Sequence, residues 1–190
     1  KRIVAALQAK GVNAVGLTGA DMDIIRSHKR EPKMVTMDDG SKQLVDFGFV
    51  GDVDLANGRR LAALIKPQEG VEAVVPVVAP LTHDGKGNIL NTNADTMAAT
   101  VAKALTEEFE VTLTYCFEKP GVMADADDDD SVIPTINTES YTQLKADGIV
   151  SGGMIPKLDN AFDSISSGVK CVVITHFMDI QACMGTIIEK

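Results

Sequence analysis

The sequence predicts an α/β protein, a three-layer α/β/α sandwich with a mostly parallel central sheet and an inserted β-hairpin. Short apolar runs typical of buried strands alternate along the chain with segments whose apolar residues have helical spacing. An acidic glycine turn at residues 38–40 separates two strand-like arms, as in a hairpin. No internal repeat or low-complexity linker divides the 190 residues, which suit one domain.

The first third of the chain is expected to hold a helix, a strand and the hairpin. Apolar residues with helical spacing open the chain, and residues 12–17 (VNAVGL) then form a short strand-like run. The hairpin arms are expected at residues 33–37 and 44–50, and the basic stretch before them favours a solvated surface over an anion site. Asp54 is expected to cap a helix over residues 55–65.

Polar residues gather at a predicted junction between a strand and a helix. Residues 73–81 (AVVPVVAPL) predict a strand buried on both faces, and a Gly-rich polar turn leads from it to a helix over residues 97–105. Asn91, Asn93 and Asp95 lie at the start of that helix. Ligands of open α/β sheets bind at such junctions, and two amides with a carboxylate suit a polar, charged ligand. Helix capping accounts for the same residues equally well.

The second half of the chain predicts a second junction of this kind. Residues 111–117 read as a buried strand, and the acidic run 125–130 lacks the EF-hand pattern, which favours a solvated loop over a calcium site. Gly152 and Gly153 allow a ligand to approach the backbone closely, and Lys157 lies just inside the helix that follows. An ordinary surface lysine is the alternative for Lys157.

The last predicted elements are a helix beginning at Thr138 and strands at residues 169–175 and 186–188. His176, which follows the first of these strands, is expected to be a hydrogen-bonded loop residue.

Composition excludes several functional classes. The net charge of −9 argues against a general nucleic-acid binder, and neither an apolar run of membrane-spanning length nor a signal peptide is visible. Three cysteines without CxxC spacing favour reduced thiols and a cytoplasmic protein. Cys116 and Cys171 lie in strand-like runs and are expected to be buried.

Four separated stretches resemble acetylglutamate kinases, within the amino acid kinase family, and they occur in the family's order. They are residues 14–19 (AVGLTG), 48–53 (GFVGDV), 91–95 (NTNAD) and 152–157 (GGMIPK). The closing Gly185-Thr186 also fits the family.

The resemblance implies transfer of the ATP γ-phosphoryl group, with Mg2+, to the side-chain carboxylate of an N-acylglutamate in arginine biosynthesis. It implies that Lys157 and Asp95 are catalytic, with Lys157 stabilising charge on the transferring phosphoryl and Asp95 orienting the catalytic lysines. It assigns the acylglutamate to Asn91, and Asn93 is predicted to bind substrate beside it. It also implies two nucleotide-binding stretches, formed by Glu118, Lys119, Pro120, Gly121, Val122 and Met123 and by Ile149, Val150 and Ser151. No residue is predicted to be a dedicated metal ligand.

The resemblance further implies a single domain over residues 1–190, with residues 70–190 as its nucleotide-binding half, and at least a homodimer. Glycine loops, a lysine and an arginine of the family are expected to precede Lys1, so an N-terminal part is expected to be missing. One departure concerns the nucleotide turn, where the family usually has Thr or Ser before Asp and this chain has Phe117 before Glu118.

Two alternatives stay open from the sequence. One is a kinase of the same family with another acceptor, such as aspartate, glutamate or N-succinylglutamate. The other is a non-catalytic nucleotide or amino-acid sensor that keeps the fold, because fold alone does not establish activity.

Overall fold

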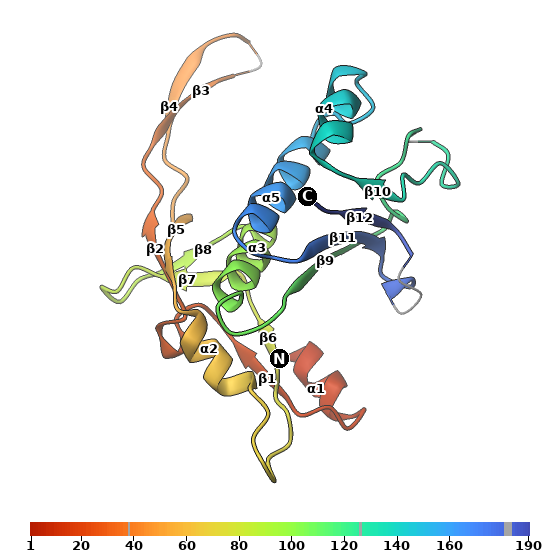
Figure 1. Ribbon diagram of the computed structural model, residues 1–190. Helices are drawn as coiled ribbons and strands as arrows, with labels where there is room; N and C mark the ends of the chain where they lie inside the picture. Colours follow the sequence, from red (N-terminus) through yellow and green to blue (C-terminus); the bar gives the residue numbers. More distant parts are fainter. Residues whose placement is uncertain (38, 126, 181–183) are drawn as a thin grey trace. The chain divides into compact units, whose positions relative to one another are not determined.

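The computed structural model describes residues 1–37, 39–125, 127–180 and 184–190, and it confirms the predicted α/β class (Figure 1). The chain forms two compact units, residues 1–97 and residues 98–190. Within the described residues, every helix is too short or too polar to cross a membrane.

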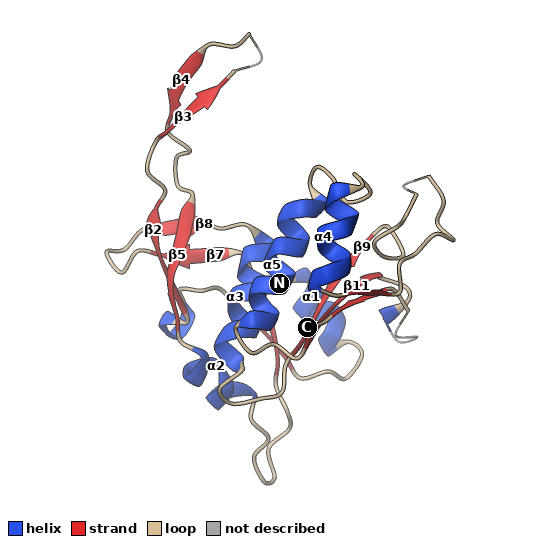
Figure 2. Ribbon diagram, turned by 45° about the horizontal axis from the view of Figure 1, so that its top comes forward, coloured by secondary structure: helices blue, strands red, loops and turns tan. Residues whose placement is uncertain are grey.

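Runs of one to four strands separate most of the helices along the chain, and Figure 2 distinguishes helices from strands by colour. The helices are α1 (Arg2–Gln8), α2 (Gly58–Ile65), α3 (Ala94–Leu105), α4 (Thr138–Ala146) and α5 (Met154–Ser166), with a short 3-10 helix at Asp21–Asp23. The strands are β1 (Ala14–Leu17), β2 (Ile25–Lys29), β3 (Lys33–Thr36), β4 (Lys42–Val45), β5 (Gly51–Ala56), β6 (Val75–Val78), β7 (Leu81–His83), β8 (Ile89–Asn91), β9 (Thr112–Phe117), β10 (Thr135–Ile136), β11 (Cys171–His176) and β12 (Thr186–Ile188).

The first unit contains the predicted hairpin. β3 and β4 pair antiparallel, with Lys33 opposite Val45, and Gly40 in their turn has a φ of +79°. The hairpin extends beyond β2 and β5, which lead into and out of it (Figure 1). A four-stranded sheet, in the order β5-β2-β7-β8, and the parallel pair β1-β6 complete the strands of this unit.

Two predictions around the hairpin are wrong. The second arm ends at Val45 rather than at residue 50, and Asp54 does not cap a helix. Asp54 lies in β5 at an irregularity in the β2–β5 register, and its carboxylate is 2.6 Å from the imidazole of His28. Pairing with β2 keeps this segment extended, so α2 begins later and is capped by Asn57.

The predicted buried strand over residues 73–81 is also wrong in extent and burial. β6 and β7 are separate strands, and the side chain of Val75 is 43% exposed. Pro80 lies between the two strands, where its fixed φ and missing N–H favour a break. The Gly-rich turn that follows joins β7 to β8 as an antiparallel hairpin.

The second unit is built around one sheet, in the order β10-β12-β11-β9. β9 and β11 run parallel in register from Thr112 opposite Cys171 to Phe117 opposite His176, and β12 returns antiparallel to β11. Apolar residues from this sheet and from α3, α4 and α5 form one continuous core. The fully buried members include Ile136, Leu158, Ala161, Val172, Ile174 and Ile188.

The alternation of β9 explains why one cysteine prediction fails. Leu113 and Tyr115 point into the core, which turns the intervening side chains outward, and Cys116 is exposed rather than buried. Cys171 is partly buried, both are free thiols, and Cys183 lies outside the described residues.

Candidate active site

Two of the sequence motifs of the first unit meet at the break between β6 and β7. The backbone N–H of Gly19 donates to the carbonyl of Leu81 at 2.6 Å, and that of Thr92 donates to the carbonyl of Pro80 at 3.0 Å. The segment between the two strands therefore fixes the ends of the AVGLTG and NTNAD stretches against one another.

The GFVGDV stretch contacts the same place. The N–H of Asn91 donates to the carbonyl of Phe49 at 2.7 Å. A Cβ on Gly51 would lie 2.8 Å from Cβ of Leu90 and 3.0 Å from Oγ1 of Thr82, so this close approach of β5 to β7 and β8 requires glycine. Three of the four stretches thus form one cluster in the first unit.

A buried threonine anchors the Asn91–Asp95 segment. Thr92 is only 3% exposed, and its Oγ1 lies 3.1 Å from Oγ1 of Thr82 and 3.4 Å from the carbonyl oxygen of Gly51. The residues on either side of it, Asn91 and Asn93, are exposed. The anchor leaves both amides accessible at the end of β8.

Asn93 caps α3. Its side-chain oxygen accepts a hydrogen bond from the backbone N–H of Thr96 at 3.0 Å, and Asp95 lies half-buried in the first turn of the helix. A carboxylate there also interacts favourably with the helix dipole. Capping therefore accounts for the side-chain oxygen of Asn93, and its role in substrate binding stays a prediction.

The basic stretch before the hairpin is matched by carboxylates. Lys29 donates to Asp46 at 2.9 Å, and Arg30 forms a forked pair with Asp52. The hydrogen bond from Arg30 holds the pKa of Asp52 below its usual value. This pairing agrees with the solvated surface that the sequence favoured.

In the second unit, the Glu118–Met123 loop begins where β9 ends. Glu118 and Lys119 are exposed, whereas Gly121 and Val122 are buried. Lys119 donates to Asp129 at 2.9 Å, and this hydrogen bond raises the pKa of the Lys119 ammonium. The early part of the loop therefore presents side chains to solvent, and its later part joins the core.

A second buried threonine anchors this loop. Thr186 is 0% exposed, and its hydroxyl accepts from the N–H of Val122 at 2.8 Å and donates to the carbonyl of Ile133 at 2.7 Å. Gly185 before it has a φ of +127°, and a Cβ there would clash with the carbonyl oxygen of Ile174. The closing Gly-Thr stretch thus holds the loop in place through a side chain.

The second predicted nucleotide stretch is divided between core and solvent. Val150 is 2% exposed and belongs to the core, whereas Ile149 and Ser151 are exposed. The backbone carbonyl of Ser151 accepts from the N–H of Met154 at 3.2 Å, at the start of α5. Side-chain contacts with a ligand are therefore open to Ile149 and Ser151, but not to Val150.

Lys157 lies in the first turns of α5. Its Nζ is 3.5 Å from the centre of the Phe117 ring, at the end of β9. An added Cβ on Gly152 or Gly153 would meet open space, so the backbone before the helix is accessible. The second unit therefore gathers an ammonium group, an aromatic ring and an accessible glycine bend.

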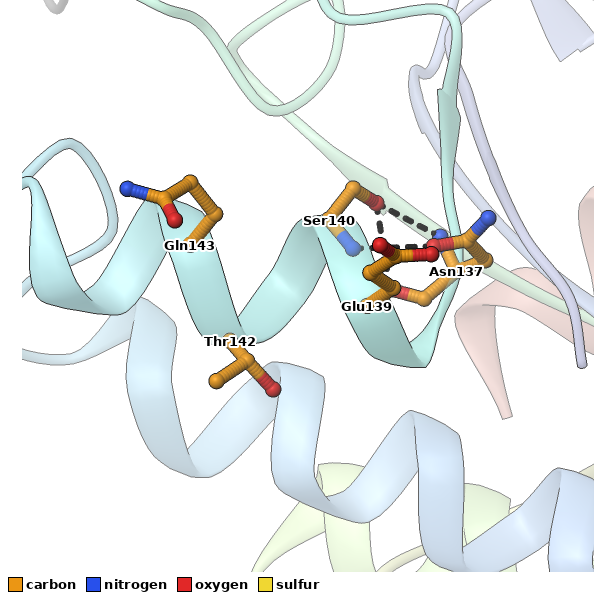
Figure 3. A pocket seen from close by; sticks show the side chains of 5 residues that line it. All are labelled: Asn137, Glu139, Ser140, Thr142 and Gln143. Atoms are coloured by element: carbon orange, nitrogen blue, oxygen red, sulfur yellow. Dashed lines mark hydrogen bonds between the residues drawn. The ribbon is translucent and has the colours of Figure 1, made fainter.

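A hollow beside α4 does not include these residues. It measures about 600 Å³ and is lined by Asn137, Glu139, Ser140, Thr142 and Gln143 (Figure 3). Asn137 and Ser140 hydrogen-bond each other reciprocally as a capping box, which satisfies their polar groups. Asn137 and Ser140 therefore serve to begin the helix.

Within the described ranges, no group of three or more His, Cys, Asp or Glu side chains could hold a metal ion. Residues 125 and 127–130 form an exposed loop, and Ala126 lies outside the described residues.

Sequence reasoning missed the residues that support both places. Thr82 and Thr92 carry no pattern that marks them as buried anchors, and the Gly185-Thr186 pair gives no local sign that Thr186 is buried. Phe117 stands where the family usually has Thr or Ser in the nucleotide turn, and this difference does not indicate a contact with Lys157. Its contact with Lys157 joins residues 40 positions apart, which no local signal reveals.

Comparison with known proteins identifies the relatives of this chain. The sequence profile of the Amino acid kinase family matches residues 1–176. The acetylglutamate kinase of Phocaeicola vulgatus is 57% identical over 190 residues, which cover all of this chain and 68% of that protein. The acetylglutamate kinase of Bacteroides thetaiotaomicron is 56% identical over the same coverage.

Solved structures agree with the fold. A Streptococcus mutans protein of known crystal structure matches with a TM-score of 0.69 at 24% identity, covering 97% of this chain and 64% of that chain. A carbamate kinase from Giardia matches with a TM-score of 0.62 at 15% identity, covering 98% of this chain and 66% of that one. These matches confirm the predicted three-layer α/β/α fold, and the β3–β4 pairing confirms the hairpin.

Proposed function

The chain belongs to the amino acid kinase family, and on this premise we propose that it catalyses the ATP-dependent phosphorylation of the side-chain carboxylate of N-acetyl-L-glutamate. The observation that carries the proposal is the 57% identity over the full chain to an acetylglutamate kinase. The product is an acyl phosphate, formed in the biosynthesis of arginine.

The reaction sets clear requirements for the protein. Phosphoryl transfer needs little covalent chemistry, but it needs aligned reactants and positive charge near the equatorial oxygens of the transferring group. We assign this charge to Lys157, whose place at the start of α5 adds the positive end of the helix dipole. Asp95 is assigned as the acceptor that orients catalytic ammonium groups, because a carboxylate binds and aligns them strongly.

The acylglutamate is assigned to Asn91, with Asn93 beside it. An amide can hydrogen-bond a carboxylate or an acyl amide without adding charge repulsion. The exposure of Asn91 and the buried anchor at Thr92 support this role, since a rigid support fixes the direction of the amide.

The nucleotide is assigned to the Glu118–Met123 loop and to residues 149–151. Both stretches belong to the second unit, and the loop follows the carboxyl end of β9, where α/β sheets bind ligands. We take residues 70–190 as the nucleotide-binding half of a single kinase domain.

Mg2+ enters the proposal as part of the Mg·ATP co-substrate. Mg2+ usually keeps several waters and binds substrate phosphates with one or two carboxylates, so it needs no larger protein cluster. Glu118 carries the one carboxylate of the Glu118–Met123 loop, and this side chain is exposed. The ion would supply charge neutralisation on the β- and γ-phosphates.

The same premise extends to assembly and location. We propose that the enzyme works in the cytoplasm, where ATP is available. We also propose that it forms at least a homodimer, as its resemblance to the family implies. Light scattering on the purified protein measures the assembly directly, and a monomeric mass under assay conditions would contradict it.

The activity is tested with the complete purified protein, Mg·ATP and a panel of acceptors. Trapping the acyl phosphate with hydroxylamine is expected to detect product from N-acetylglutamate and little from glutamate or aspartate. Faster turnover of N-succinylglutamate would overturn the choice of acyl group. Absence of product with every acceptor, despite ATP binding, would favour a non-catalytic sensor.

A further inference from the structure

The ammonium group of Lys157 lies against an aromatic face. Its Nζ is 3.5 Å from the centre of the Phe117 ring, well inside the distance of about 6 Å at which a cation is attracted to a ring face. Both residues belong to the second unit, with Lys157 on α5 and Phe117 at the end of β9.

The ring is the better-fixed partner of this pair. Phe117 packs against the core, lies opposite His176 in the parallel β9–β11 ladder, and accepts a backbone hydrogen bond from Phe177 at 3.3 Å. The lysine side chain has four rotatable bonds and is only half-buried. Contact with a fixed ring therefore restricts where the ammonium group can go.

A ring holds a cation in a way that differs from an ion pair. The ring face attracts the ammonium group through its quadrupole and adds no counter-charge. In the same unit, Lys119 donates to Asp129 at 2.9 Å and Lys170 donates to Glu110 at 2.7 Å, and each pair is close to neutral. Contact with the Phe117 ring therefore positions the ammonium group of Lys157 without itself placing a negative charge beside it.

We propose that Phe117 is a positioning residue for Lys157, whose ring holds the ammonium group beside the nucleotide loop, ready to meet the transferring phosphoryl group. This inference rests on the proposed function of Lys157. It gives Phe117 a role that acts through another side chain, rather than one of direct contact with the nucleotide.

The test is a double-mutant cycle in the complete protein. Phe117→Leu keeps an apolar side chain but removes the ring face, and it is expected to lower kcat about threefold to tenfold with little change in KM for ATP. Phe117→Tyr keeps the ring and is expected to retain turnover. In a Lys157→Ala background, Phe117→Leu is expected to lower kcat no further.

Phe162→Leu is the matched control. Phe162 also packs against the core of the second unit, but its ring stacks on Tyr141, with centroids 5.0 Å apart. This variant is expected to lose stability in the same way while keeping kcat. Equal loss of kcat in both variants would overturn the proposal.

Other outcomes distinguish the positioning role of Phe117 from the catalytic role of Lys157. A raised KM for ATP with unchanged kcat in Phe117→Leu means that the ring contacts the nucleotide, and it overturns the positioning role alone. An additional loss of kcat in the Lys157→Ala background does the same. Unchanged turnover in Lys157→Ala would remove Lys157 from the mechanism and the inference with it.

A second test leaves Phe117 unchanged, so its result does not depend on whether a Phe117 variant folds. NMR of lysine labelled at the ε-carbon is expected to show ring-current-shifted ε-methylene protons for Lys157, identified by their loss in Lys157→Arg. Lys170, which pairs with a carboxylate, provides the unshifted reference. Unshifted Lys157 protons in the ligand-free protein would overturn the proposal.

Discussion

Each unit of the protein holds its candidate binding segment with a buried threonine, but the two anchors differ. Thr92 lies within its own segment and bonds another hydroxyl and a carbonyl across β7 and β5. Thr186 lies 64 residues from Val122, the loop residue that it supports, and bridges an N–H to a carbonyl.

The difference indicates a division of labour. In the first unit, exposed amides flank the anchor, and the supporting contacts are mostly between backbones, which suits recognition of a small polar acceptor. In the second unit, a side chain ties a loop to a continuous core, next to a cation held by a ring. Changes at Asn91 and Thr92 should therefore affect the acceptor, and changes at Lys157 and Thr186 should affect ATP and turnover.

The largest effect on turnover is expected from Lys157→Ala. Loss of one group that stabilises transition-state charge is expected to lower kcat by about 100-fold to 1,000-fold, with a small change in KM for N-acetylglutamate. Steady-state kinetics of the complete protein measures it. Lys170→Ala, on the same unit but paired with Glu110 at the surface, is the control and should keep full turnover.

The two anchors can be compared by removing one hydroxyl at a time. Thr186→Val leaves a buried N–H and a buried carbonyl without partners and is expected to lower the free energy of unfolding by about 2–4 kcal/mol. It should raise KM for ATP, whereas Thr92→Val should raise KM for the acylglutamate. Urea unfolding and two-substrate kinetics test both variants.

The exposed Thr142 supplies the control for that pair, because its hydroxyl bonds only a carbonyl one turn earlier on α4 among the described contacts. Thr142→Val should change neither KM nor stability appreciably. Equal effects of Thr92→Val and Thr186→Val on both substrates would remove the division of labour.

Asn91 and Asn93 lie two residues apart but have different proposed roles: Asn91 binds the acylglutamate, and Asn93 caps α3. Asn91→Ala is expected to raise KM for the acylglutamate about tenfold with unchanged stability, because a hydrogen bond to a charged group is lost. Asn93→Ala is expected to cost about 1 kcal/mol of stability through loss of the α3 cap. Asn93→Asp, which can still cap, should restore stability; a failure to do so would contradict the capping assignment.

Acid is expected to affect the first unit before the second, although the effect is small. Hydrogen bonds from Lys29 and Arg30 lower the pKa values of Asp46 and Asp52, and one from Asn88 lowers that of Asp84 to about 2. A carboxyl whose pKa is lowered on folding stabilises the fold above its unfolded pKa, so this contribution falls as the pH drops from about 4 toward 2.

Limited cleavage by pepsin at decreasing pH, with the fragments identified by mass spectrometry, measures which unit unfolds first. Peptides from residues 1–97 should appear at a higher pH than peptides from residues 98–190. Asp52→Asn, which removes one of the titrating groups, should reduce the acid sensitivity of the first unit. Simultaneous cleavage of both units across the titration would contradict the prediction.

Much of the chain could be predicted because its signals are local. The helical spacing before Leu105, the apolar and β-branched run of β9 and the glycine turn of the hairpin each depend on neighbours within a few residues. The errors arose where tertiary pairing decided the outcome. Asp54 carries a good capping side chain, yet pairing with β2 keeps it in a strand.

The sequence by itself determined the family, the fold class and the positions of the polar residues at the ends of strands and starts of helices, because those follow from spacing and residue type. Only the tertiary structure decided that Thr92 and Thr186 are buried anchors and that Lys157 lies on Phe117. These contacts join segments far apart in the chain, and no local propensity encodes which of them will meet once the core has formed.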